Sequence, residues 1–284
     1  MRTRSEGLER KKDIILFALG SCRNDAPCLD ANGNANETSS CCNEFPVFDA
    51  DGFAHWYPSG RKHHRLEVAC DAVVLALGSV TSWVMVSMIL VRSSRAGDSM
   101  LKQLGLVVYC IAVLWMLNVS AAWNTVPWKR SWRQTLMFLD GAGIYVMIAG
   151  SFTPIVLQCE CYKMLALQWA IVAVGMTRLA LKVCSKPDNK GSVGDPVQTV
   201  GYVLMVLSAG TVWRSLQTSL SPKAFQELMA GVLAYGVGVP IYSTSWLRFN
   251  MCVWHIFVLA GSILIYMSIY NDIAGGRLAG TPYA

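Results

Sequence analysis

Charged side chains are scarce in this chain of 284 residues, since only 15% of them are Asp, Glu, Lys or Arg. A soluble protein carries about 25%, and the apolar share here is correspondingly high at 54%. The few charges gather in short stretches, and uncharged runs of about twenty residues recur between them, long enough to cross ~30 Å of hydrocarbon. Water is therefore not the main solvent of this chain, and the sequence predicts a multi-pass integral membrane protein.

No nucleic-acid-binding motif accompanies the net charge of +6. The Lys and Arg residues lie mostly beside apolar runs, a pattern that reflects membrane topology and contact with anionic headgroups. Membrane lipids, and not nucleic acids, are therefore the expected partners.

The ten cysteines do not indicate a disulfide scaffold, because several lie inside apolar runs, where Cys behaves as a small hydrophobic residue. Four others, which could pair or stay reduced, lie in the polar N-terminal region: Cys22, Cys28, Cys41 and Cys42. Residues 1–22 also resemble a signal peptide, because basic residues precede a short apolar stretch, although Asp13 lies directly before that stretch. The sequence leaves both cleavage and retention open.

Seven apolar runs predict an all-α bundle of seven transmembrane helices over residues 67–272. Residues 1–66 are polar and lack periodicity, which predicts a mostly disordered extension, and residues 273–284 form a short tail. The loops on the N-terminal side of the membrane hold more Lys and Arg, which predicts a cytoplasmic N-terminus. The expected spans are 68–92, 104–126, 136–158, 164–183, 197–217, 228–247 and 251–271.

Polar side chains within the spans are the candidates for chemistry, because each costs several kcal/mol in hydrocarbon unless it is paired. Ser120 and Asn124 share one helix face near the end of the second span. Asp140 and His255 lie about one turn into the third and seventh spans. Since alternate spans run in opposite directions, all four are expected at one depth, in the cytoplasmic leaflet.

A metal site, a hydrogen-bonded relay or a polar plug between helices could each use these groups. Cys70 and Asp71, at the beginning of the first span, lie at the same depth.

Three sequence blocks and Ser120 resemble the hemolysin III and progestin/adipoQ receptor family, which includes the adiponectin receptors. The blocks are Leu139 to Ile144, Ala149 to Pro154 and Trp254 to Ser262. The resemblance implies a seven-helix bundle that holds zinc near the cytoplasmic face through three histidines. In some members it also implies hydrolysis of lipid amides such as ceramides, with the serine and the aspartate, here Ser120 and Asp140, assisting a metal-activated water.

The chain departs from that pattern at the metal ligands. Asn124 and Met251 occupy two of the three family histidine positions, and His255 alone is kept. An amide oxygen is a weak neutral ligand, and zinc rarely accepts a thioether, so zinc binding is doubtful. In the family's first-span pattern of Glu, Asn and His, Glu67 fits while Cys70 and Val74 replace the other two.

Two other arrangements are possible. Cys70, Asp140, Cys252 and His255 could supply a rebuilt set of metal ligands. Alternatively, Asp140 pairs with His255 without metal, bridged by Ser120 and Asn124. His63 and His64 are expected in a basic strip that faces lipid headgroups.

These observations predict a diverged, weakly catalytic or non-catalytic member that binds a lipid, another small molecule or a membrane partner in a polar cavity. The alternative is a metal-dependent lipid amide hydrolase with an altered ligand set. Pore formation has no support, because the spans carry no ring of charges.

Overall fold

The structure is a computed structural model that describes residues 53–54, 63–126, 130–185, 196–244 and 246–276. Apart from the antiparallel pair of two-residue strands β1 (Phe53–Ala54) and β2 (His63–His64), the regular structure in these ranges is helical. The helices are α2 (Arg65–Ala96), α3 (Met100–Thr125), α4 (Arg130–Gln158), α5 (Tyr162–Ser185), α6 (Pro196–Ser208), η1 (Ala209–Val212), α7 (Trp213–Ser219), α8 (Pro222–Ser243) and α9 (Asn250–Asp272).

Within the described residues, six helices are long and apolar enough to cross a membrane, namely α2, α3, α4, α5, α8 and α9. The predicted fifth span, 197–217, is a segmented rod of α6, η1 and α7. A short 3-10 turn that contains Gly210 separates its two α-helices, and glycine is a poor helix former. Together these elements form the predicted seven-helix bundle.

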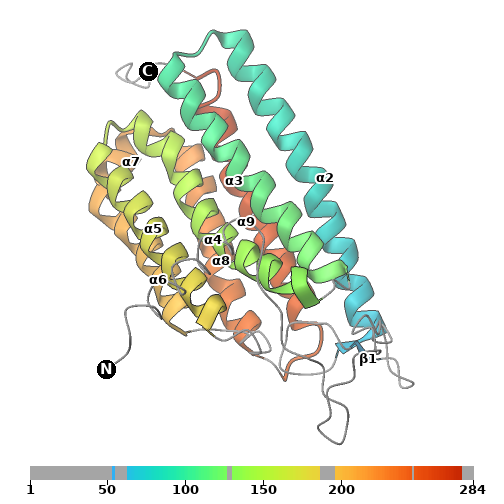
Figure 1. The fold of residues 1–284 in the computed structure, drawn as a ribbon. Coiled ribbons are helices and arrows are strands. Elements are labelled where there is room, and N and C mark those ends of the chain that lie inside the picture. Colours follow the sequence, from blue (N-terminus) through green and yellow to red (C-terminus); the bar gives the residue numbers. More distant parts are fainter. Residues whose placement is uncertain (1–52, 55–62, 127–129, 186–195, 245, 277–284) are drawn as a thin grey trace, which may run out of the picture.

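The bundle closes on itself, because the first and last rods are neighbours (Figure 1). Helix α2 packs against both α3 and α9, and α9 packs most extensively against α8. The short connections between successive helices make them antiparallel neighbours. The beginnings of α2, α4 and α9 and the end of α3 therefore lie at one level, as the sequence predicts.

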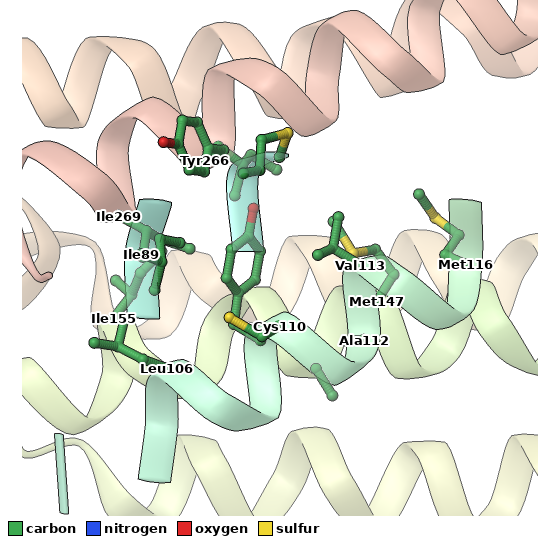
Figure 2. Packing of buried hydrophobic residues seen from close by; sticks show 14 of the residues in the cluster. Ile89, Leu106, Cys110, Ala112, Val113, Met116, Met147, Ile155, Tyr266 and Ile269 are labelled. Atoms are coloured by element: carbon green, nitrogen blue, oxygen red, sulfur yellow. The ribbon is translucent and has the colours of Figure 1, made fainter. Parts of the chain in front are cut away.

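The buried apolar core lies where α2, α3, α4 and α9 meet (Figure 2). Ile89, Ile155 and Ile269 are completely buried, and Leu106 is 1% exposed. Lipid tails are as apolar as these side chains, so close packing, and not the hydrophobic effect alone, holds such helices together.

Two glycines let α8 and α9 approach closely. A Cβ atom added to Gly231 would lie 3.0 Å from the carbonyl oxygen of Gly261, and the reverse substitution would give the same distance. Small residues at such crossings allow the backbones of membrane helices to touch. This contact fixes α9, which carries His255, against α8.

Most of the predicted extension, including its four cysteines and residues 1–22, lies outside the described residues. Its last part differs from the prediction at His63. That side chain is 1% exposed, and its Nδ1 lies 3.1 Å from Glu67 Oε2. His63 therefore does not face lipid headgroups, because the β1–β2 pair turns it towards the first turn of α2.

Candidate functional site

A cavity of about 430 Å³ lies inside the bundle and is lined by side chains from all seven rods. Ser120, Asn124, Asp140, Met251 and His255 all line it, so the structure brings the five predicted residues to one space. Gln198, Tyr202 and Lys182 line the same end. This end, at the level where α2, α4 and α9 begin, is the polar end of the cavity.

The rest of the cavity is apolar. On α4 its lining continues from Asp140 to Ile155, fifteen residues further along the helix. At 1.5 Å per residue this is a depth of about 22 Å. Leu228 and Ile265 line the deep part from α8 and α9. The cavity therefore joins one polar end to a long apolar interior.

Ser120 and Asn124 form a hydrogen-bonded pair on α3, as their four-residue spacing predicts. Asn124 Nδ2 donates to the backbone oxygen of Ser120 at 2.9 Å and contacts its Oγ at 3.3 Å. A carbonyl oxygen only accepts, so it fixes the amide with its nitrogen towards Ser120. Asn124 Oδ1 is then a buried acceptor with no donor among the described residues.

Asp140 lies near Ser120 and His255. Its carboxylate interacts with the Ser120 hydroxyl and with the charge that His255 can carry. The next residue, Gly141, accepts a hydrogen bond through its backbone oxygen from Tyr202 Oη at 2.8 Å. Tyr202 Oη also accepts a hydrogen bond from Gln198 Nε2 on the same helix. The hydrogen bond from Tyr202 to Gly141 joins α6 to α4 beside Asp140.

The partner of His255 is Asp71, not Asp140. His255 Nδ1 lies 2.5 Å from Asp71 Oδ1, and the two residues are 5% and 1% exposed. The structure thus corrects the predicted pairing of Asp140 with His255, because α2 packs directly on α9 at this level and brings Asp71 to the histidine. Asp140 also lines the cavity and interacts with His255 electrostatically.

A second carboxylate one turn earlier on α2 extends this arrangement. Glu67 is 4% exposed, contacts His63 through Oε2, and lies 3.7 Å from Arg248 Nε through Oε1. Asp71 and Glu67 are four residues apart and share one helix face. Two carboxylate–histidine pairs, Asp71–His255 and Glu67–His63, therefore lie at this end of the bundle, and of these four residues His255 lines the cavity.

The residues at the positions where the resemblance implies metal ligands do not fit zinc. His255 Nε2 could bind a metal while Asp71 orients the ring, which is the usual support for a histidine ligand. Asn124 and Met251 offer only an amide oxygen and a thioether, neither of which is a usual zinc ligand. No step through a metal follows from this donor set.

The rebuilt ligand set is not assembled either. Within the described part of the chain, no three His, Cys, Asp or Glu side chains lie close enough to hold one ion. Cys70 is exposed on the bundle surface, whereas Cys252 is 8% exposed.

Sequence reasoning placed Asp71 at the correct depth but missed its role. A buried carboxylate in the first turns of an otherwise apolar helix was the available signal, because such a group requires a partner. Gln198 and Tyr202 were also missed. Their four-residue spacing on α6 places both on one helix face, but nothing in the sequence shows that this face lines the cavity.

Comparisons with known proteins identify the family that this sequence matches. Residues 73–266 match the sequence profile of the family described as Haemolysin-III related. The chain is 23% identical to "Hemolysin-3" of Bacillus cereus over 207 residues, which covers 72% of this chain and 90% of that protein. It is 25% identical to a "Hemolysin-3 homolog" of Bacillus subtilis (strain 168) over 166 residues, or 57% and 74% of the two chains. The family match covers more than half of the chain, so this multi-pass membrane protein belongs to the haemolysin-III related family.

Proposed function

We propose that the protein binds an amphipathic lipid in this cavity and is a weakly catalytic or non-catalytic member of its family. The observation that carries the proposal is a cavity that joins four polar side chains to an apolar interior about 22 Å deep. Ligand sites in proteins are concave and largely apolar, with a few placed polar groups that fix orientation. A lipid tail fits the interior, and its polar group meets Ser120, Asn124, Asp140 and His255.

The polar end favours a headgroup that donates hydrogen bonds. Asn124 Oδ1 is a buried acceptor without a donor among the described residues, and an unmade buried hydrogen bond costs about 1–3 kcal/mol. The carboxyl group of Asp140 offers further acceptor oxygens at the same end of the cavity. A hydroxyl or amide N–H group on the ligand can donate to Asn124 Oδ1 and to Asp140.

The donor set supports the proposal of weak or absent catalysis. Metal-assisted hydrolysis needs an ion that activates water, and Asn124 and Met251 stand where the family's ligands would be. His255 is held by Asp71, which suits a group that orients or hydrogen-bonds a ligand.

A metal-dependent lipid amide hydrolase is the second candidate. The proximity of Asp140 to Ser120 and His255 favours it, because these are the residues that the family resemblance implicates in hydrolysis. Stoichiometric zinc in the purified protein, together with hydrolysis of a ceramide that is lost in Asp140→Asn, would establish this second function.

The binding proposal is tested by the lipid that copurifies with the protein. Val206 lines the cavity from α6, whereas Leu204 on the same helix is 56% exposed and does not line it. Native mass spectrometry should find about one bound lipid fewer per chain in Val206→Trp than in the wild type and in Leu204→Trp. Equal occupancy in the two tryptophan variants would contradict the proposal.

A further inference from the structure

A second hollow lies at the opposite end of the bundle from the polar end of the cavity. It has a volume of about 600 Å³ and is formed by the last turns of α2 together with Tyr270 of α9 and Gly275. Arg92 and Arg95 of α2 both line it, beside Met88 and Val91. The hollow therefore joins two cationic side chains to an apolar strip.

Arg92 is held in a fixed orientation. Its Nε donates to the backbone oxygen of Ala274 at 2.6 Å, and its guanidinium carbon lies 4.4 Å from the centre of the Tyr270 ring. A stacked, hydrogen-bonded guanidinium loses little further freedom when it binds an anion, and its planar donors suit phosphate oxygens. The terminal Nη groups of Arg92 make no hydrogen bond to any residue that the structure describes.

The positive charge of the hollow is not neutralised by the nearby carboxylate. Asp98 Oδ1 lies 2.9 Å from Lys102 Nζ, and Asp98 Oδ2 accepts the Gly275 amide at 2.8 Å. Lys102 therefore compensates Asp98. Among the described residues, no acidic side chain forms an ion pair with Arg92 or Arg95.

The surroundings of the hollow are those of a lipid. Helix α2 has 32 residues, or about 48 Å at 1.5 Å per residue, and is longer than the ~30 Å hydrocarbon core. Its last turns therefore reach the headgroup region. Met88 and Val91 are 44% and 49% exposed and continue an outward apolar face of α2 that includes Val84 and Val80.

From these contacts we infer that the hollow binds the headgroup of an anionic phospholipid. The phosphate is held by Arg92 and Arg95, and an acyl chain lies along Met88 and Val91. This site is separate from the cavity and does not depend on the proposed function. A phospholipid and free inorganic phosphate both present a phosphate group to the two arginines. The apolar strip beside the arginines favours the phospholipid over free phosphate.

The test uses the full chain in detergent, titrated with phosphatidylglycerol or phosphatidylcholine of the same acyl chains and followed by native mass spectrometry. Wild type should bind phosphatidylglycerol more tightly by roughly 30-fold, the factor expected for two basic contacts at a membrane surface. Arg92→Gln/Arg95→Gln should lose this preference. The control Arg214→Gln/Lys223→Gln removes the same charge from residues outside the hollow and should keep it.

Two further measurements test the inference. Arg95 is exposed and makes no hydrogen bond or ion pair with a described residue, so Arg95→Gln should fold normally and lose part of the preference. Inorganic phosphate in molar excess over the lipid should not displace it. An unchanged preference in the double variant, an equal loss in the control, or displacement by phosphate alone would overturn the inference.

Discussion

His255 and Asp71 form a buried pair between the last and the first transmembrane helices, with Nδ1 and Oδ1 2.5 Å apart. His255 also lines the polar end of the cavity together with Asp140, with which it interacts electrostatically. The Nδ1 side of the imidazole therefore holds α2 against α9, and in the proposed function the other side of the ring is the one that meets a ligand.

Asp71→Asn should destabilise the protein strongly. Removing one partner of a buried pair costs about 3–5 kcal/mol, because the other partner is left without compensation. Thermal unfolding of the purified variant measures this loss. In Asp71→Asn/His255→Gln the two losses should be less than additive, since residues in one network couple by about 0.5–3 kcal/mol. Strict additivity would show that the two residues do not act together.

Asn124→Leu should separate stability from binding. The variant removes a buried acceptor for which the described part of the chain offers no donor, so its unfolding temperature should stay equal or rise. Its copurified lipid should fall, because the acceptor for the headgroup is lost. A variant that keeps full lipid occupancy would exclude Asn124 from ligand recognition.

Gly231→Ala should weaken the packing of α8 on α9. Its Cβ would lie 2.7 Å from Ile265 Cγ1 and 3.0 Å from the Gly261 oxygen. The control is Gly236→Ala on the same helix, whose Cβ would meet nothing within 4 Å. The control should be neutral or gain up to about 1 kcal/mol from helix propensity. Equal unfolding temperatures for the two variants would contradict the close crossing.

The contribution of Asp98 to the stability of the folded protein should decrease as the pH falls. Burial raises the pKa of this carboxyl, but its hydrogen bonds and the Lys102 charge outweigh burial and hold the pKa below the ordinary value of 3.8. A lowered folded-state pKa contributes stability above the unfolded value and loses it as the pH falls through the folded value. The difference in unfolding temperature between wild type and Asp98→Asn should therefore be larger at pH 6 than at pH 3. A difference that grows towards pH 3 would contradict this assignment.

The sequence predicts the helices well, because a run of about twenty apolar residues has few alternatives in a membrane. The span 251–271 appears as Asn250–Asp272, and 104–126 as Met100–Thr125. The fifth rod is the exception. Its break at Ala209–Val212 depends on local backbone geometry that a hydropathy pattern does not encode.

The common depth of the candidate site could also be predicted, because helix direction alternates along the chain. The pairing within that depth could not. Asp71 and Asp140 lie at similar levels, and the choice between them as the partner of His255 depends on α2 packing against α9. The burial of His63 depends likewise on the β1–β2 pair, which lies outside the hydrophobic pattern.

The central claim is that the polar end of the cavity recognises a ligand by hydrogen bonds and holds no zinc. Zinc content after purification without chelators tests this claim most directly, in the wild type and in Asn124→His/Met251→His, which restores both family ligands beside His255. The wild type should contain far less than one zinc per chain, and the double variant should approach one. Stoichiometric zinc in the wild type that is lost in both His255→Ala and Asp140→Ala would contradict the account.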